Sequence, residues 1–417
     1  MRKARGSERR ISWSRALFAL PAMALAAAST APAVGATNAG DDWTQFRGAN
    51  QNFTTTERGW SVSGQSEPVW KRTVGLGYSS MSVANGRLYT MGYDVEAKLD
   101  GIYCLDALTG AIIWEHHYPA DIWARSHRGG TLVTPGVDGK DLYCSNREGR
   151  FFRFDAATGA IHWEKDLKTE YDLTYPTWGL AASPFILDDM IVMNVGKVIA
   201  FQKGSGKEIW VTQKNYGDAY CTPVEFMLKG QSCLAVFNQT GLVILDRKTG
   251  VEVVVQEWSN RVNVNAAAPL ILGERVFISS GYNRGCALVD LSGDSSSVVW
   301  ENKEMRNHMA PSLLHDQHLY GFDEGVYKCL DLEGNVKWQQ RGLGKGAHIM
   351  ADGKVILLTD KGDLVFVEPD PVEYREIART KVLDGGVYWT NPILANGYIY
   401  CRNSNGDIVC LDHRSRQ

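Results

Sequence analysis

One short phrase recurs along the chain every 40 to 50 residues, and it constrains the fold more than any other feature of the sequence. Its clearest copies read YCLDALTGAIIW at 103–114 and FRFDAATGAIHW at 152–163. Self-similarity at this period predicts one supersecondary unit stacked many times, as in propellers and solenoids. Further copies occupy 199–210, 243–254, 287–300 and 327–338, with a degenerate copy at 366–377 and a truncated copy at 408–412.

Each copy of the phrase has the chemistry of a β-hairpin. In the first copy an alternating apolar strand leads to Asp106, whose carboxylate can accept backbone N–H groups in a turn. Gly110 follows, and glycine supplies the positive φ that a tight turn requires. The second strand ends in a large ring, which suits a joint between two sheets. The tryptophans expected at such joints are Trp70, Trp114, Trp163, Trp210, Trp300 and Trp338.

A second hairpin lies upstream of each phrase. Its turn is a pair such as Asn85-Gly86 or Asp138-Gly139, and such pairs between alternating runs are strong hairpin signals. Two hairpins make a four-stranded antiparallel blade, and the number of turns indicates eight blades. The predicted fold is therefore all-β, an eight-bladed β-propeller. The other six turns lie at 188–189, 229–230, 273–274, 316–317, 352–353 and 396–397.

The two ends of the repeat region complement each other. The eighth unit stops at Asp412 after three strands, and PVWKRTVG at 68–75 is an orphan strand of the missing kind. We expect 68–75 to complete the last blade and close the ring, which removes exposed sheet edges. FRGAN at 46–50 lies outside the repeats and is expected to pack as a lid or latch. The predicted domains are a signal peptide at 1–36, an N-terminal extension at 37–67, the propeller at 68–412 and a tail at 413–417.

The first 36 residues have the pattern of a cleaved secretory signal. Several basic residues precede an apolar run from Ala16 to Ala28, and small residues follow at 34–36. The continuation after Arg9-Arg10 is a poor twin-arginine signal, so we expect the general secretory route and a periplasmic or secreted protein. This segment carries six basic side chains and one acidic one, so the remaining chain has a net charge of −8 instead of −3. That charge argues against nucleic acid as a partner, and no later segment is apolar enough to span a membrane.

Eight cysteines remain in a chain that is predicted to be exported. The simplest interpretation of those on strands is a small buried hydrophobic side chain. An alternative is a disulfide between Cys401 and Cys410. A two-residue turn at Asn405-Gly406 would place these two cysteines directly opposite each other, close enough for a bridge.

The phrase D-x-x-T-G-x-x-x-W resembles the tryptophan motif of pyrroloquinoline quinone (PQQ) repeat propellers, over roughly 68–412. That family includes quinoprotein alcohol dehydrogenases and the outer-membrane assembly factor BamB, both eight-bladed. DDWTQFRGAN at 41–50 and SSGYNRGCALVDL at 279–291 further resemble exported bacterial proteins called PQQ-like β-propeller repeat proteins. The resemblance implies either a dehydrogenase or a scaffold that lends its loops and a blade surface to other proteins.

A quinoprotein needs specific parts beyond the fold. These are a Ca²⁺ held by oxygen ligands beside the quinone and an Asp that acts as a base. Dehydrogenases of the family also often carry two adjacent, disulfide-linked cysteines, and this chain has no Cys-Cys pair and no C-x-x-C-H motif for a haem. We therefore assign no catalytic and no metal-binding residue, and PQQ with Ca²⁺ stays an alternative cofactor.

The residues that lead into each first strand should ring one mouth of the axial channel. Aromatic, cationic and amide groups that converge at a concave mouth are typical of ligand sites. Arg128 and Lys345 would suit a carboxylate or phosphate, and the rings would suit a flat or sugar-like ligand. The other interpretation is that a wet channel is polar without binding anything, and that the rings only seal the blades. The candidate ligand-binding residues are Arg128, Trp178, Tyr220, Asn265, His308, Lys345, His348 and Trp389.

The function predicted from the sequence is an exported, non-catalytic and monomeric propeller that binds a protein partner or a small ligand at its funnel face. A BamB-like scaffold of the cell envelope that uses an outer blade edge is a second interpretation. The alternative in a different class is a PQQ-dependent dehydrogenase of alcohols or sugars.

Overall fold

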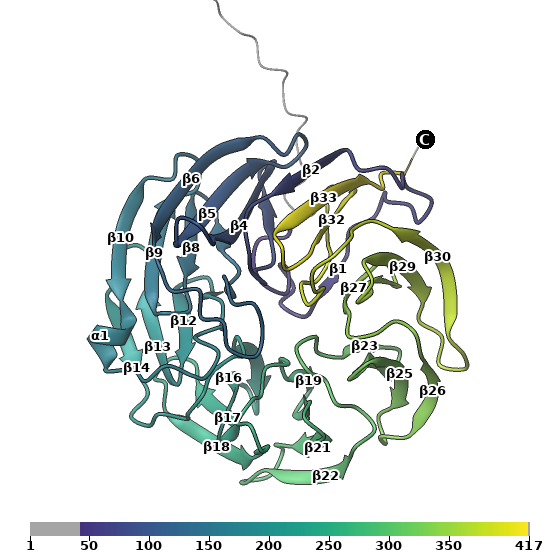
Figure 1. Ribbon diagram of the computed structural model, residues 1–417. Coiled ribbons are helices and arrows are strands. Elements are labelled where there is room, and N and C mark those ends of the chain that lie inside the picture. The colour runs from purple at the N-terminus through teal and green to yellow at the C-terminus, as the bar shows by residue number, and fades with distance from the viewer. Residues whose placement is uncertain (1–41, 416–417) are drawn as a thin grey trace, which may run out of the picture. The chain divides into compact units, whose positions relative to one another are not determined.

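The computed structural model describes residues 42–415, which all belong to the compact unit Thr37–Gln417. In this range the chain forms eight sheets of four antiparallel strands, and one of these sheets carries an additional short strand, β1. The sheets follow one another around a common centre (Figure 1), so the predicted eight-bladed β-propeller is confirmed. The predicted signal peptide at 1–36 lies outside the described residues.

We number the blades in the order of their first strands. Blade 1 contains β3 (Ser82–Ala84), β4 (Arg87–Asp94), β5 (Leu99–Asp106) and β6 (Ile112–Pro119). Blade 2 contains β7 (Gly136–Asp138), β8 (Asp141–Ser145), β9 (Arg150–Asp155) and β10 (Ile161–Asp166), which leads into the short helix α1 (Leu167–Tyr171). Blade 3 contains β11 (Phe185–Ile186), β12 (Met190–Val195), β13 (Lys197–Gln202) and β14 (Glu208–Val211). Blade 4 contains β15 (Val224–Leu228), β16 (Gln231–Asn238), β17 (Gly241–Asp246) and β18 (Glu252–Glu257).

The second half of the ring repeats this order. Blade 5 contains β19 (Leu270–Leu272), β20 (Arg275–Ser280), β21 (Gly285–Asp290) and β22 (Ser297–Asn302). Blade 6 contains β23 (Leu313–His315), β24 (His318–Asp323), β25 (Val326–Asp331) and β26 (Val336–Gln340). Blade 7 contains β27 (Ala347–Ala351), β28 (Lys354–Leu358), β29 (Asp363–Glu368) and β30 (Arg375–Lys381), with β1 (Thr54–Thr55) paired to β27. Blade 8 contains β31 (Ile393–Ala395), β32 (Tyr398–Arg402), β33 (Asp407–Asp412) and β2 (Trp70–Thr73).

The turns have the backbone that their residues favour. Asn85 and Gly86 connect β3 to β4 with φ angles of 53° and 73°, in the left-handed region that suits asparagine and glycine. Between β5 and β6, the carboxylate of Asp106 accepts the backbone N–H groups of Leu108 at 3.0 Å and Thr109 at 2.8 Å. The local chemistry of the repeated phrase therefore produces one hairpin in each copy.

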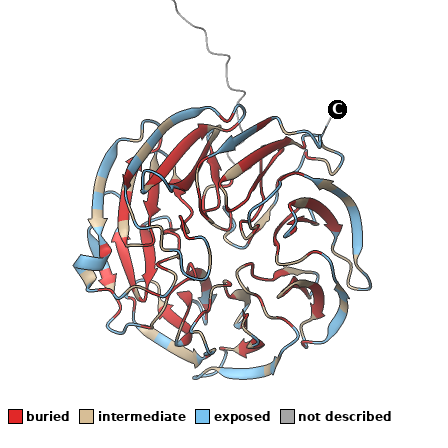
Figure 2. Cartoon of the chain, in the orientation of Figure 1, coloured by how far each residue is buried: buried red, intermediate tan, exposed pale blue. Residues whose placement is uncertain are grey.

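Burial follows the position of a strand in its blade (Figure 2). β4 and β5 are buried over most of their length, whereas in the fourth strand β6 only Tyr118 is buried. Apolar side chains of neighbouring blades share a cluster, as Met91 of β4 does with Phe152 of β9. The core of the protein thus lies between the facing sides of adjacent blades.

The repeated tryptophans connect each blade to the next. Trp210 donates its Nε1–H to the carbonyl of Arg247 at 3.1 Å, and Trp338 makes the corresponding bond to Asp370 at 2.7 Å. Trp163 has the same position, but its Nε1–H has no hydrogen-bond partner among the described residues. Equivalent bonds of 2.8–3.0 Å come from Trp70, Trp114 and Trp300.

Blade 8 combines strands from both ends of the described chain. β2 runs antiparallel to β33, with Trp70 opposite Cys410 and Thr73 opposite Asp407. The strand order in this sheet is β2-β33-β32-β31, and Figure 1 shows the purple N-terminal strand beside the yellow C-terminal one. The orphan strand recognised in the sequence at 68–75 contains β2.

Residues 42–57, which we call the strap, run past the hairpin-turn ends of several first strands. Asp42 accepts the backbone N–H of Asn85 at 3.1 Å, beside the turn of blade 1. β1 then pairs in parallel with the end of β27 in blade 7. Glu57 is buried, and its carboxylate accepts the backbone N–H of Asn396 at 3.1 Å in blade 8. The segment at 46–50 is part of this strap, with Arg47 and Gly48 buried and Ala49 and Asn50 exposed.

The predicted pairing of Cys401 with Cys410 is wrong. Cys401 lies opposite Val409, and Cys410 lies opposite Tyr400. The hairpin has a longer connection than the expected two-residue turn, because Arg402 already pairs with Ile408. This shift of one residue turns the two cysteine side chains to opposite faces of the sheet. All eight cysteines are buried and free.

Candidate functional site

The predicted site residues lie in the segments that lead into the first strands, except His348, which lies within β27. Because all first strands of a propeller run in the same direction along its axis, these segments meet at one end of the channel, which we call the mouth. Six of the candidates lie in these loops, and all of them except the buried Tyr220 are partly or fully exposed. They are Arg128 before β7, Trp178 before β11, Tyr220 before β15, His308 before β23, Lys345 before β27 and Trp389 before β31.

Aromatic rings from different blades form a continuous row at the mouth. Tyr78, which precedes β3, stacks on Trp389 with ring centroids 5.0 Å apart. Its other neighbour is His127, at 5.2 Å and nearly perpendicular. On the far side, the ring of His308 lies 6.5 Å from Trp389 and 4.5 Å from Tyr282. We call these five residues the ring row. All five are half-buried, so each ring keeps part of its surface in contact with solvent.

An ion pair flanks the ring row at His308. Lys345 Nζ lies 2.5 Å from a carboxylate oxygen of Glu324, and this carboxylate also accepts the backbone N–H of Tyr282 at 3.0 Å. Burial, together with the nearby charge of Lys345, lowers the pKa of His308 to about 4. Burial also lowers the pKa of His127. Both imidazoles are therefore neutral near pH 7, and the row presents apolar ring faces with uncharged nitrogen atoms.

Two other candidates form a separate pair of rings. Trp178 and Tyr220 lie with centroids 5.9 Å apart, and the hydroxyl of Tyr220 donates to Asp218 at 3.2 Å. Arg128 is exposed, and its guanidinium donates to the side-chain oxygen of Asn405 in blade 8. Arg128 thus offers a cation beside the row that is not occupied by a carboxylate among residues 42–415.

The structure buries three of the predicted site residues, Tyr220, Asn265 and His348, and the last two are almost completely enclosed, which corrects their role. His348 donates Nε2–H to the carbonyl of Pro311 at 2.7 Å and accepts the hydroxyl of Tyr327 at Nδ1, 3.0 Å away. The side-chain amide of Asn265 donates to two backbone carbonyls at 2.7 and 3.1 Å. The exposed fraction is 0% for His348 and 1% for Asn265. Both side chains therefore connect adjacent blades by hydrogen bonds and do not line the mouth.

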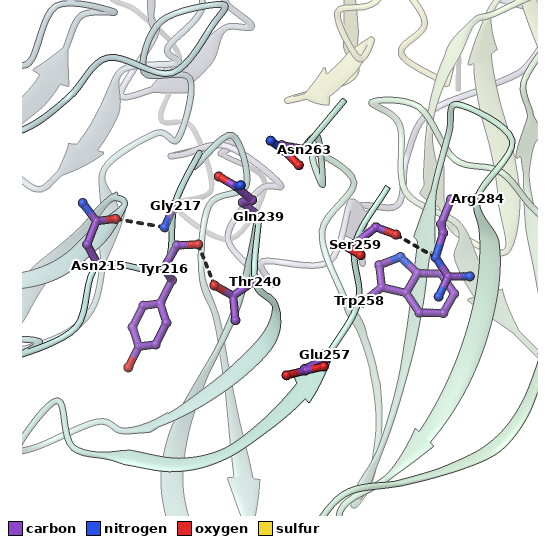
Figure 3. A pocket seen from close by; sticks show the side chains of 10 residues that line it. All are labelled: Asn215, Tyr216, Gly217, Gln239, Thr240, Glu257, Trp258, Ser259, Asn263 and Arg284. Carbon is purple, nitrogen blue, oxygen red and sulfur yellow. Dashed lines mark hydrogen bonds between the residues drawn. The ribbon is translucent and has the colours of Figure 1, made fainter. Parts of the chain in front are cut away.

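A groove of about 640 Å³ opens at the same end of blades 3 to 5 (Figure 3). It is mainly polar, because amide, hydroxyl and carboxylate side chains surround it. Arg284 donates Nε–H to the carbonyl of Ser259 at 2.9 Å, and Figure 3 shows this bond at one side of the groove. The lining residues are Asn215, Tyr216, Gly217, Gln239, Thr240, Glu257, Trp258, Ser259, Asn263 and Arg284.

The cation of this groove is already engaged. The guanidinium of Arg284 lies 3.4 Å from the ring centroid of Trp258 and donates to Glu301 at 2.6 Å. Trp258 has an exposed fraction of only 2%, so its ring supports Arg284 and does not offer a face to a ligand. The groove is therefore suited to neutral hydrogen-bonding groups more than to an anion.

Sequence reasoning missed Tyr78 and most of the groove. In the loop before β3, Ser79 and Ser80 are buried, and Tyr78 carries the ring that belongs to the ring row. The signal available was the aromatic residue after Gly77, which corresponds to the pair Tyr388-Trp389 in the loop before β31. The groove depends on the packing of three blades, and no local pattern indicates it.

Metal-ligating side chains do not gather in the described part of the chain. Within residues 42–415, no group of three or more His, Cys, Asp or Glu side chains is arranged so that it could hold a metal ion. His127 and His308 are separated in the ring row by Tyr78 and Trp389. No helix in the described range is long and apolar enough to cross a membrane.

Repeat, blade count and interblade tryptophans together define a propeller of the PQQ-like repeat class. The family model described as outer membrane protein assembly factor BamB matches residues 98–340, more than half of the chain, so the chain belongs to this family. A search of curated proteins found no match.

Solved structures show the same fold at low sequence identity. BamB from Moraxella catarrhalis is 15% identical, with a TM-score of 0.59, and the match covers 83% of this chain and 99% of that one. The quinohemoprotein alcohol dehydrogenase ADHIIG from Pseudomonas putida HK5 is 12% identical, with a TM-score of 0.64, covering 90% and 81%. A second quinohemoprotein alcohol dehydrogenase, from Comamonas testosteroni, is 10% identical, with a TM-score of 0.64, covering 91% and 82%. Identities this low carry the fold and not the activity.

Proposed function

We propose that this protein is an exported propeller of the cell envelope that binds a protein partner or a small ligand at its mouth without catalysing a reaction. The observation that carries this proposal is the ring row, in which five segments contribute half-buried rings to one continuous surface. Partly exposed aromatic side chains in a concave region are the usual anchors of recognition surfaces.

The chemistry of the mouth indicates what such a surface would recognise. The neutral rings of Tyr78 and Trp389 offer apolar faces to a flat or apolar group, and the exposed Arg128 offers a cation to a carboxylate. The groove at blades 3 to 5 adds amide and hydroxyl groups at the same end. A peptide segment with an apolar side chain and an acidic neighbour has this combination of groups.

Placement in the envelope is supported by two independent features. The chain belongs to the family described as outer membrane protein assembly factor BamB. Its first 36 residues, which lie outside the described range, have the sequence pattern of a secretory signal. A scaffold role of the BamB kind is the form of partner binding that these features favour.

The competing function is a quinone-dependent dehydrogenase. Such an enzyme holds Ca²⁺ through several oxygen ligands beside the quinone. At the ring row the carboxylate is that of Glu324, and it is already occupied by Lys345 and by the backbone of Tyr282. This donor set does not fit a calcium–quinone centre, so we assign no catalytic residue.

The experiment that separates the two functions is a titration of the purified protein with PQQ in the presence of Ca²⁺. Quinone absorbance and dye reduction are followed with a panel of alcohols and sugars. The proposed function predicts neither saturable binding of the quinone nor turnover. Saturable binding with substrate-dependent dye reduction would replace the proposal with a dehydrogenase.

A further inference from the structure

The strap contains a buried arginine, Arg47, and one of its N–H groups has no hydrogen-bond partner in the described chain. Arg47 has an exposed fraction of 1%, and its two terminal nitrogens donate to the carbonyls of Thr222, at 3.1 Å, and Pro223. Its Nε–H has no hydrogen-bond partner in the described chain. The guanidinium carbon lies 5.5 Å from the ring centroid of Phe185, which shields it further from water.

No carboxylate among residues 42–415 forms an ion pair with Arg47. Buried arginines are usually paired, because removing a charge from water without a counter-charge costs several kcal/mol. Burial lowers the pKa of Arg47 to about 10, which still leaves the side chain charged at pH 7. An anion at this position would remove the imbalance.

A cavity of about 300 Å³ lies directly beside this arginine. It separates residues 50–54 of the strap from the first strands of blades 4 to 6, and Arg47 is part of its wall. The side formed by the first strands is mostly apolar, through Val224, Ala268, Pro269, Leu270, Ile271 and Leu314. It also contains Glu225, whose carboxylate is already paired with Arg247 Nε at 2.8 Å and accepts the hydroxyl of Ser232 at 2.7 Å. The opposite side carries the amide side chains of Asn50, Gln51 and Asn52.

These features select one class of ligand. A buried cation with a free N–H favours an anion that can accept a charge-assisted hydrogen bond. The apolar wall favours a hydrocarbon group next to that anion, and the volume is sufficient for a small molecule only. A phosphate or sulfate would leave the apolar wall without a partner, and a neutral molecule would leave the charge uncompensated.

We propose that this cavity is a binding site for a small organic monocarboxylate, whose carboxylate accepts the Nε–H of Arg47 and whose short apolar tail packs against Leu270 and Leu314. The strap then serves two purposes, since it closes the cavity and supplies the recognition group. The site is separate from the mouth, so this proposal does not depend on the proposed function.

The test uses pentanoate as the probe and pentanamide as its uncharged match, at constant ionic strength. The melting temperature and the heat of binding are measured for the complete protein. We expect saturable stabilisation by pentanoate and none by pentanamide. No effect of pentanoate, or an equal effect of the two compounds, would overturn the proposal.

Two variants separate recognition by Arg47 from a purely structural role. In Arg47→Met we expect the affinity for pentanoate to fall on the order of tenfold to a hundredfold, the loss of one charge-assisted hydrogen bond. If this variant does not fold, Ala268→Phe keeps Arg47 and fills the cavity, and it should also lose binding. A crystal soaked with 5-bromopentanoate should show anomalous bromine density beside Leu314. Unchanged binding in Ala268→Phe, or bromine density elsewhere only, would contradict the assignment.

Discussion

The indole of Trp210 in blade 3 lies against Gly250 in the turn of blade 4, so closely that a Cβ at Gly250 would come within 2.3 Å of the ring. The same indole donates to the carbonyl of Arg247 at 3.1 Å in that turn. Gly250 also has a φ of 68°, which a residue with a side chain adopts only with strain. One aromatic residue and one glycine thus connect consecutive blades, and the repeated phrase supplies both.

This joint predicts different costs for two equivalent tryptophans. Trp210 has a hydrogen bond to lose, whereas the buried Nε1–H of Trp163 has no partner within residues 42–415. Trp210→Phe should therefore lower the free energy of unfolding by about 1 kcal/mol more than Trp163→Phe. Urea denaturation of both variants measures this difference. Equal losses would show that the indole N–H contributes nothing to the joint.

A buried ion pair between blades 1 and 2 gives a second prediction. Arg147 Nη1 lies 2.7 Å from Asp100 Oδ1, and the exposed fractions of the two side chains are 1% and 0%. Arg147→Met leaves a buried carboxylate without its partner, and it should cost about 3–5 kcal/mol of stability. The double variant Arg147→Met/Asp100→Leu should recover most of that loss, as measured by chemical denaturation. A double variant no more stable than the single one would contradict this reading.

The pH dependence of stability should report on His348. Burial lowers its pKa from the ordinary value of 6.5 to about 4 in the folded protein. Between these two values the unfolded chain binds a proton that the folded chain excludes, so stability falls as the pH decreases from 6.5 towards 4. The contribution of this histidine is at most about 3 kcal/mol.

The control for this prediction is His348→Gln, which can still donate to the carbonyl of Pro311 but does not titrate. Denaturation curves recorded from pH 7 to pH 4 should show a shallower decline for the variant than for the wild type. His308 has a similarly lowered pKa and is present in both proteins, so its effect cancels in the comparison. Parallel declines would mean that His348 is not responsible.

Thiol chemistry tests the register of the last hairpin. All eight cysteines are buried and free, and burial raises the pKa of the Cys410 thiol to about 12. We expect a thiol reagent to react slowly with the native protein and to count eight thiols after denaturation without a reductant. A count of six, with a peptide linking Cys401 and Cys410, would show that the register is different from the one described.

The repeated phrase was sufficient to predict the blades, because Asp106, Gly110 and Trp114 act within one hairpin or between neighbouring hairpins. The phrase could not predict features that depend on the exact length of a turn, such as which residues lie opposite each other in a hairpin. The connection before Asp407 is longer than a two-residue turn, and that shift separated Cys401 from Cys410.

The mouth shows the same limit. Spacing located the correct loops, but it could not tell which residue of a loop points to solvent, as Tyr78 beside Ser79 illustrates. Whether a polar side chain is buried depends on the blades on both sides, and this decided the roles of Asn265 and His348.

Removing the two cations of the mouth should affect binding without affecting the fold. Lys345 forms a partly exposed ion pair and Arg128 is exposed, and surface interactions of this kind contribute little to stability. The variant Arg128→Ala/Lys345→Ala should therefore keep its melting temperature nearly unchanged and lose the ligand or partner of the mouth. Calorimetry and a binding assay on the same preparation check both halves. A large drop in melting temperature would assign these residues a structural role.

The most direct measurement of the central claim is quantitative capture of envelope components by three forms of the protein. They are the wild type, the mouth variant Tyr78→Ala/Trp389→Ala, and the control Val372→Ser, which changes a residue with an exposed fraction of 78% in the turn between β29 and β30. If the mouth is the binding surface, the wild type and the control capture the same components in equal amounts, and the mouth variant loses them. Equal capture by all three folded proteins would contradict the claim that the ring row binds the partner.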